Sequence, residues 1–224
     1  MQLQSLIARS VVFAGVAYSY VWAFWLQHET IGSFTEIKDG ATSVTAGANP
    51  QAVLMGLVGL AVYCVLLNTP VKGQELRVAP MWRRTAAFVV DFWFVIFTSG
   101  ALLGCIDVLL EATRTGIFRW HFHRDYLVAT DGVSFALVLV GLAAFVAYFL
   151  LPLVRRGQTV GCWIFSLATV NFDGYVIYTP FSTAIRRLLW EFRGVCSPLK
   201  TFRKRDEQGR TFYDIESGFT VVCY

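Results

Sequence analysis

Charged residues are scarce in this chain. Only 15% of its 224 residues are Asp, Glu, Lys or Arg, whereas 56% are hydrophobic. One soluble core of this size cannot hide so large an apolar fraction, so the composition excludes an ordinary soluble globular protein. The surplus apolar surface predicts an integral membrane protein that uses the lipid bilayer as its solvent.

Sequence motifs of enzymes and of metal sites are also missing. The chain has no P-loop, no dinucleotide-binding fingerprint, no H-E-x-x-H and no nucleophile elbow. Its five cysteines are scattered without a C-x-x-C pair, which excludes a zinc ribbon and predicts reduced thiols. The net charge of +4 is carried by basic residues that flank apolar runs, a pattern of membrane orientation and not of nucleic-acid binding. We therefore expect no enzymatic activity, no cofactor and no nucleic-acid partner.

Four apolar runs approach the length of about 20 residues that a helix needs to cross a bilayer. They cover about residues 10–26, 52–71, 85–110 and 133–154. The first run ends in Tyr and Trp and not in a small-residue cleavage site, so we interpret it as a retained helix. The predicted fold is an all-α membrane protein with four transmembrane helices. Residues 1–79 contain the first two of these helices, and residues 80–222 contain the other two.

The distribution of basic residues predicts the orientation. If both termini are cytoplasmic, only Lys38, Arg114, Arg119 and Arg124 of the 19 Lys and Arg residues face the other side. Basic residues accumulate in the cytoplasmic segments of membrane proteins. We therefore expect both termini in the cytoplasm, in a bacterial inner membrane. Residues 27–51, between the first two runs, are polar and are predicted to form an exposed loop.

The chain after residue 154 is predicted to stay at the cytoplasmic surface. Apolar residues recur at helical spacing within 180–193, against Arg186, Arg187 and Arg193. This pattern predicts an amphipathic helix whose guanidinium groups lie among anionic lipid headgroups. A short cytoplasmic tail follows, with a strand-like stretch at 218–222.

One face of the third run carries Arg84, Ala87 and Asp91, spaced i, i+3 and i+7. Asp91 lies roughly 10 Å further along the helix than Arg84, inside the hydrocarbon. A carboxylate at that depth is costly unless it is protonated, paired or hydrated. Two interpretations stay open: a proton or cation site, and the slightly favoured structural carboxylate that pairs a basic residue. For Asp107, near the outer end, we expect a solvated or capping role.

Small residues at a spacing of four predict close helix contacts. Gly100 with Gly104, and Gly157 with Gly161, each form a G-x-x-x-G motif. Such motifs let the backbones of two membrane helices approach closely.

Two histidines lie one residue apart, at His121 and His123. In a strand both would point to the same face and could share a metal ion. Because no third and fourth ligand is evident, the favoured interpretation is an interfacial loop anchored by Trp120, without a metal.

Five short motifs follow one another in an order that resembles the RDD family of membrane proteins. They are Arg84-Thr85-Ala86-Ala87 with Asp91, Gly157-Gln158-Thr159-Val160-Gly161, Val170-Asn171-Phe172-Asp173-Gly174, Ala184-Ile185-Arg186-Arg187, and the ending Arg210-Thr211-Phe212-Tyr213-Asp214 with Gly218 and Thr220-Val221-Val222. The resemblance covers about residues 80–222. The sequence departs from the family at Cys162, where a basic residue is frequent, and in its two added N-terminal helices.

The resemblance implies a two-helix core with amphipathic cytoplasmic segments, and a signature of one arginine and two aspartates. We assign the signature to Arg84, Asp91 and Asp214, with Asp173 as the alternative for the second aspartate. A meeting of Asp214 with Arg84 at the membrane surface would fold the tail back onto the third run. The resemblance also implies transport of unidentified ligands.

Three functions remain possible, in descending order of support. The first is a non-catalytic accessory or scaffold subunit that packs against other membrane subunits or against itself; the aromatic content of 16% and the small-residue motifs favour it. The second is a small transporter or cation/proton exchanger that uses Asp91. An enzyme comes last, because no site for one is evident.

Overall fold

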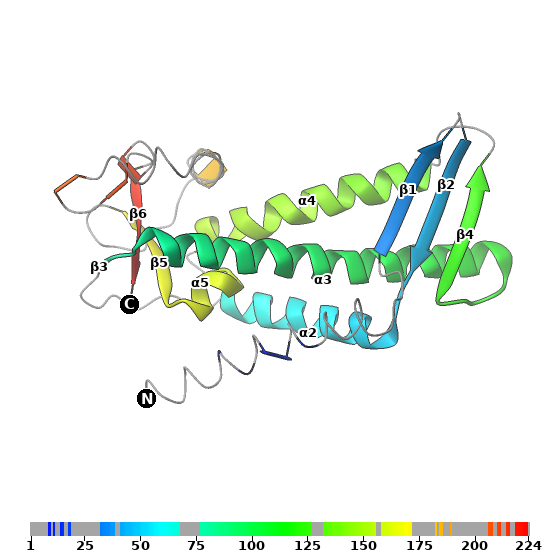
Figure 1. Ribbon diagram of the computed structural model, residues 1–224, viewed down its shortest axis with the longest axis horizontal. Helices are drawn as coiled ribbons and strands as arrows, with labels where there is room; N and C mark the ends of the chain where they lie inside the picture. Colours follow the sequence, from blue (N-terminus) through cyan, green and yellow to red (C-terminus); the bar gives the residue numbers. More distant parts are fainter. Residues whose placement is uncertain are drawn as a thin grey trace. The chain divides into compact units, whose positions relative to one another are not determined.

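The computed structural model describes residues 9, 11, 14, 15, 18, 32–38, 41–67, 77–126, 132–155, 158–171, 182, 184, 185, 189, 206, 207, 210, 211, 214, 215 and 218–223. Figure 1 shows the elements along the chain. In order they are β1 (Gly32–Lys38), β2 (Ala41–Gly47), α2 (Pro50–Leu67), β3 (Arg77–Val78), α3 (Met81–Thr115), β4 (His121–Tyr126), α4 (Gly132–Arg155), α5 (Val160–Ile164), β5 (Leu167–Asn171) and β6 (Phe219–Cys223).

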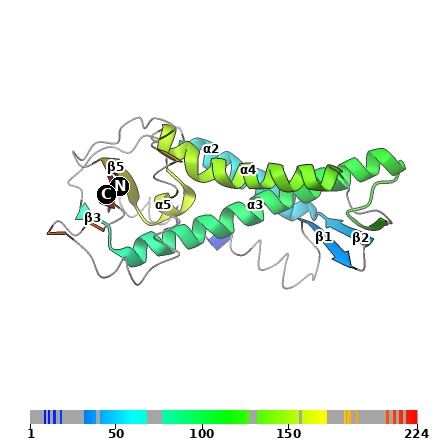
Figure 2. The same cartoon turned by 90° about the horizontal axis from the view of Figure 1, so that it is seen from above.

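Two segments that the sequence analysis assigned to loops form a sheet. Strands β1, β2 and β4 pair antiparallel in that order, and β1 and β2 lie side by side in Figures 1 and 2. The expectation of loops at 27–51 and around His121 was therefore wrong for these stretches. The physical reason is visible in the sequence. Lys38 pairs with Ala41, so the connection is the dipeptide Asp39-Gly40, a preferred hairpin sequence between strands rich in β-branched residues.

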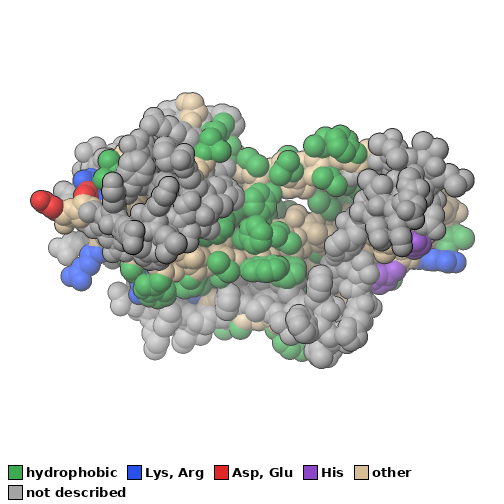
Figure 3. All heavy atoms as spheres, turned by 45° about the horizontal axis from the view of Figure 1, so that its top comes forward, with side chains coloured by type: hydrophobic (Ala, Val, Ile, Leu, Met, Phe, Trp, Pro, Cys, Tyr) green, Lys and Arg blue, Asp and Glu red, His purple; other side chains and the backbone are tan. Residues whose placement is uncertain are grey.

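Three helices are long and apolar enough to cross a membrane. Their spans are Pro50–Leu67, Met81–Thr115 and Phe135–Val154, and they correspond to the second, third and fourth predicted runs. Many of their large apolar side chains are exposed, and Figure 3 shows hydrophobic side chains in green on this surface. Exposed apolar surface on a helix of this length is what contact with lipid requires.

The first predicted span and the predicted amphipathic helix fall mostly outside the described residues. The residues of these segments that are described, 11, 14, 15 and 18 in the first and 182, 184, 185 and 189 in the second, are helical. The three arginines expected among lipid headgroups, Arg186, Arg187 and Arg193, lie outside the described part. The strand expected at 218–222 is present as β6.

The chain divides into two compact units. Unit 1 comprises residues 1–9, 62–93 and 147–224, and unit 2 comprises residues 10–61 and 94–146. Unit 1 holds the antiparallel sheet β3-β6-β5 with α5, and unit 2 holds the sheet β1-β2-β4. Each of α2, α3 and α4 contributes residues to both units.

Close helix contacts in unit 2 occur at glycines of α2. A Cβ on Gly59 would lie 3.1 Å from Phe94 Cζ and 3.3 Å from the Thr98 hydroxyl, and one on Gly56 would lie 3.4 Å from Leu102 Cγ. Gly59 therefore sits where α2 and α3 approach each other. At Gly100 an added Cβ would meet no described atom within 4 Å, so the described contacts do not give this glycine the packing role that its motif suggested.

The remaining expectations for α3 concern Gly104 and Asp107. Gly104 is buried. Asp107 is only 6% exposed, so the solvated position expected for it was wrong. The helix continues to Thr115 instead of ending near residue 110, and Asp107 therefore lies within the helix, next to the buried Val108.

Substitutions at Gly59 and Gly100 should show that the contacts of a glycine, and not its spacing in the sequence, determine its effect on stability. Gly59→Val should lower the free energy of unfolding by about 1–3 kcal/mol, because its side chain would push against Phe94 and Thr98. Gly100→Ala should stay within about 0.5 kcal/mol of the parent protein. Reversible unfolding in mixed micelles would measure both, and equal effects at the two positions would contradict the α2–α3 contact.

Candidate functional site

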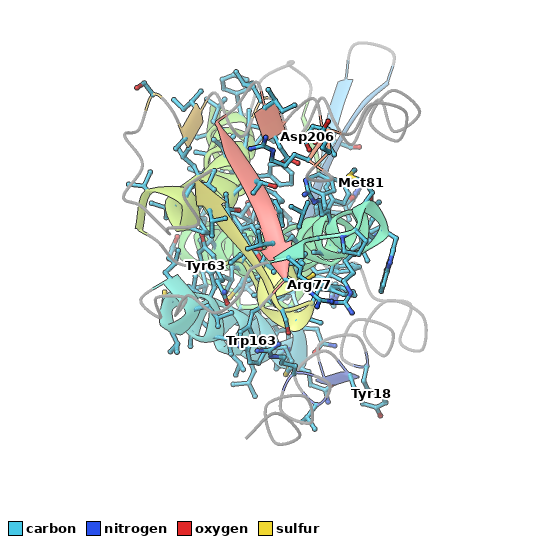
Figure 4. All side chains as sticks on the ribbon, turned by 90° about the vertical axis from the view of Figure 1, so that its left-hand side faces the viewer. Tyr18, Tyr63, Arg77, Met81, Trp163 and Asp206 are labelled. Atoms are coloured by element: carbon cyan, nitrogen blue, oxygen red, sulfur yellow. The ribbon has the colours of Figure 1, made fainter. Side chains whose placement is uncertain are left out.

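The C-terminal strand β6 organises unit 1. It lies between β3 and β5, with Val78 opposite Val222 and Leu167 opposite Cys223. Figure 4 labels Arg77, at the start of β3, and Met81, at the start of α3. Because β3 leads almost directly into α3, the sheet fixes the beginning of that helix. Four apolar residues form a core beneath it: Ala79, Ala87, Leu167 and Val221.

Arg84, at the end of the first turn of α3, connects that helix to the C-terminal segment. Its Nη1 donates to Asp214 Oδ1 at 2.9 Å and Oδ2 at 2.8 Å. Its Nε donates to the Ala79 carbonyl at 3.1 Å, and its Nη2 to the Val221 carbonyl at 3.0 Å and the Thr220 hydroxyl at 3.5 Å. These acceptors match the five N–H donors of a guanidinium. The ion pair between Arg84 and Asp214 that the resemblance suggested is thus present.

Asp214 is held from its own side as well. It is 1% exposed, and its Oδ2 accepts hydrogen bonds from the Thr211 amide at 2.9 Å and the Thr211 hydroxyl at 3.0 Å. The Asp214 amide donates back to the Thr211 hydroxyl at 3.3 Å, which is a reciprocal capping arrangement. Gly218, with φ +76°, closes the turn by donating to the Asp214 carbonyl at 3.0 Å. The carboxylate is therefore held by its own segment as well as by Arg84.

Asp91 lies two turns further along α3 and is 3% exposed. Its Oδ1 accepts from the Tyr148 hydroxyl at 2.5 Å and from the Gly161 amide at 2.6 Å. Its Oδ2 accepts from the Thr159 hydroxyl at 2.6 Å. The sequence led us to expect a basic partner, and that pairing stays a prediction. The hydrogen bonds described for Asp91 come from two hydroxyls and a backbone amide, in α4, in α5 and in the residue before α5.

Both hydroxyls are oriented by backbone amides. The Val160 amide donates to the Tyr148 hydroxyl at 3.0 Å, and the Cys162 amide donates to the Thr159 hydroxyl at 3.2 Å, which makes Thr159 the N-cap of α5. A hydroxyl has one proton, and in this arrangement each proton points to Asp91. The carboxylate and the start of α5 therefore hold each other in place. Gln158, the residue before Thr159, donates to the Leu167 carbonyl at 3.4 Å.

At Gly161 the backbone of α5 lies very close to α3. A Cβ built on it would lie 2.1 Å from the Ala87 carbonyl oxygen and 2.8 Å from the Asp91 carboxyl carbon. No side chain fits there. The glycine thus provides the close approach that its motif predicted, and the element it approaches is α3. The missing side chain lets the Gly161 amide reach the Asp91 carboxylate. Gly157 lies outside the described residues.

Tyr148 is supported by a second tyrosine. The Tyr63 ring, labelled in Figure 4, stacks on the Tyr148 ring with centroids 4.5 Å apart. The Tyr63 hydroxyl donates to the Tyr148 backbone carbonyl at 2.7 Å. Residues of α2, α3 and α4 are therefore joined through Tyr148, since its hydroxyl reaches Asp91.

The N-terminal segment also reaches α5. The Arg9 guanidinium lies 5.5 Å from the centre of the Trp163 ring, which Figure 4 labels, and Arg9 donates to the Ser166 hydroxyl. Ser166 adopts a φ of 54°, in the left-handed region that a residue with a side chain seldom occupies. This contact had no signal in the sequence.

Three of the four predicted signature residues, Arg84, Asp91 and Asp214, are described and are buried or nearly so in unit 1. Asp173 lies outside the described part. Tyr148 was not predicted as a site residue, although it is one of few residues with a polar side-chain atom in the apolar run 133–154. Among the described residues no group of three or more His, Cys, Asp or Glu side chains is arranged to hold a metal ion.

The chain matches one known protein family over most of its length. The family model described as the RDD family matches residues 78–220, a stretch that contains Arg84, Asp91, Gly161 and Asp214. No curated protein and no solved structure shows significant similarity to the chain.

Removal of the Arg84 guanidinium should destabilise unit 1 strongly. Arg84→Ala leaves Asp214 buried beside vacant acceptors, and loss of one partner of a buried ion pair costs about 3–5 kcal/mol. Arg84→Lys should recover only part of this, because an ammonium group cannot reproduce the fork of donors. Unfolding in mixed micelles would measure the loss. Arg114→Ala, at an exposed arginine of the same helix, is the control, and an equal effect there would contradict the role of Arg84.

Gly161 should tolerate no side chain. Gly161→Ala should lower the free energy of unfolding by about 3 kcal/mol, at the upper end of the range for overpacking, because the methyl group would displace α5 from α3. The contact can also be tested from α3. In Asp91→Ala the Gly161 and Val160 amides should exchange hydrogen faster, because the carboxylate that holds the start of α5 is gone. Gly132→Ala, where an added Cβ meets nothing within 4 Å, should be close to neutral. A neutral Gly161→Ala would show that α5 does not approach α3 as described.

Proposed function

The chain belongs to the RDD family of membrane proteins, and from that premise we propose that it is a non-catalytic accessory or scaffold subunit of a larger membrane assembly. The observation that carries the proposal is the engagement of Asp91. Its carboxylate is buried and accepts hydrogen bonds from Tyr148, Thr159 and Gly161. A group held in this way stabilises the fold, whereas a transport site has to exchange its partners for a ligand.

Exposed aromatic side chains beside Asp91 support a protein partner. Phe92 and Trp93 form an edge-to-face pair with ring centroids 6.0 Å apart, and Trp93 is 52% exposed. Trp93 lies nine residues after Arg84, which is roughly 14 Å along the helix. Tryptophan in membrane proteins concentrates at the two lipid–water interfaces, while exposed aromatic residues are enriched where proteins meet. This position suits packing against another membrane subunit or a second copy of the chain.

The proposal includes an orientation. Arg77, Arg83 and Arg84 lie at or just before the start of α3, and more basic residues follow α4 in the sequence. The positive-inside rule places these segments in the cytoplasm. With residues 10–26 as a fourth span, the proposed topology has both termini in the cytoplasm, and the proposed membrane is the inner membrane of a bacterium.

A transport function is the second candidate, and the same cluster favours it. Carboxylate and hydroxyl oxygens are the ligands that small hard cations prefer, and an ionisable residue inside a membrane span is often functional. In this case Asp91 would have to release Tyr148 or Thr159 during each cycle. Asp91→Asn would then abolish cation- or proton-driven flux in proteoliposomes while the chain still folds.

Site-specific crosslinking at Trp93 tests the accessory role. A photoreactive amino acid at position 93 should give one discrete adduct in intact membranes, and the partner should copurify in fixed stoichiometry. The same amino acid at Val138, an exposed residue of α4, is the control for random collisions and should give no discrete adduct. A lone monomer without an adduct, together with ion flux that depends on Asp91, would replace the accessory role with transport.

A further inference from the structure

The sheet of unit 2 carries two imidazoles that the site in unit 1 does not use. His121 and His123 are alternate residues of β4, and both are exposed; histidine side chains are purple on the surface in Figure 3. We propose that His121 and His123 form a binding site for a late first-row divalent transition-metal ion, with Cu²⁺ bound more tightly than Ni²⁺ or Zn²⁺.

The strand conformation places both rings on one face. Side chains two residues apart in a strand point the same way, and their Cα atoms lie about 7 Å apart. Two imidazoles can converge on one metal ion over that distance, since each nitrogen ligand lies about 2 Å from the metal. In a loop the alternation would not be guaranteed. A shared metal ion requires that both histidines lie in a strand, and they do lie in β4.

The neighbouring strand places a glycine and a threonine beside the two histidines. In the antiparallel register Gly47 of β2 lies opposite His121, and Thr45 lies opposite His123. Residues directly opposite each other project from the same face. Because Gly47 has no side chain, β2 does not cover the His121 ring from that position.

Thr45 orients the second ring. Its hydroxyl oxygen is 2.8 Å from His123 Nδ1. When the hydroxyl accepts the Nδ1 proton, Nε2 of His123 carries the lone pair that binds a metal. An oxygen acceptor on the second ring nitrogen is the usual support for a histidine ligand.

Trp120, the residue before His121, is held by a backbone hydrogen bond and by a ring contact. The Ala48 amide donates to the Trp120 carbonyl at 2.8 Å, which ties the residue before His121 to the residue after β2. Trp120 also meets Phe118 edge to face, with ring centroids 4.9 Å apart. Rigid strands hold metal ligands more closely in place than loops do.

The ligand set determines which ions fit. Imidazole suits Cu²⁺, Ni²⁺ and Zn²⁺, and affinity for a given nitrogen site rises to a maximum at Cu²⁺. Hard cations such as Mg²⁺ and Ca²⁺ require oxygen ligands. Two protein ligands leave the other coordination positions to water, so the site binds less tightly than a four-ligand structural zinc site.

Titration of the full chain with Cu²⁺ tests the proposal. The protein is purified in detergent with a tag that contains no histidine, and binding is followed by calorimetry and by the nitrogen hyperfine pattern in electron paramagnetic resonance. We expect one high-affinity Cu²⁺ ion per chain with two coordinated nitrogens. His121→Ala and His123→Ala should each weaken binding at least about tenfold, and Thr45→Val should weaken it by a smaller factor.

His28→Ala is the matched control, because His28 is the one histidine of the chain besides His121 and His123. It should leave the affinity unchanged. Both ring-bearing residues are exposed, so their alanine variants should keep the parent's melting temperature, which separates lost binding from lost folding. Equal affinity in the parent and in both His121→Ala and His123→Ala, or no binding below millimolar Cu²⁺, would overturn the site.

Discussion

The Asp91 carboxylate determines the arrangement of unit 1. It lies in a helix apolar enough to span a membrane, where an ionisable group costs several kcal/mol unless other groups replace its hydration. Tyr148, Thr159 and Gly161 do so. Each donor imposes a further requirement. Gly161 must lack a side chain so that its amide can approach, and Thr159 must begin α5 so that its hydroxyl is held by the Cys162 amide.

Arg84, two turns before Asp91 on α3, is likewise a charged group whose hydrogen-bonding capacity is satisfied by the protein. Its guanidinium is saturated by one carboxylate, two carbonyls and a hydroxyl. A point charge on a flexible stem could not satisfy acceptors in so many directions. Arg84 and Asp91 share a helix face, yet the described partners of one are not those of the other. The signature residues on α3 therefore make two separate sets of contacts. Arg84 binds the C-terminal segment with β6, and Asp91 binds the start of α5.

Hydropathy was sufficient to predict three of the spans, because crossing a bilayer requires a length and a composition that any sequence must show locally. The cost of a buried charge likewise singled out Asp91, and the family resemblance singled out Arg84. The partners were harder to predict. Thr159 lies 68 residues from Asp91, and the pairing of Thr45 with His123 spans 78 residues. Periodicity reports only local geometry. The β1–β2 hairpin is the exception, since Asp39-Gly40 was a readable signal that the polar composition of the segment concealed.

The described polar groups divide by position, and the division bears on function. Within the spans, Asp91 and Tyr148 are engaged with the protein itself, and much of what α3 leaves exposed is apolar or aromatic. In the strand after α3, by contrast, His121 and His123 are exposed to the surroundings. Where the described polar groups within the spans serve the fold, shape and apolar contact are what the exposed face of α3 offers to a partner within the bilayer. The proposed metal site would instead use the imidazoles of β4, which are exposed.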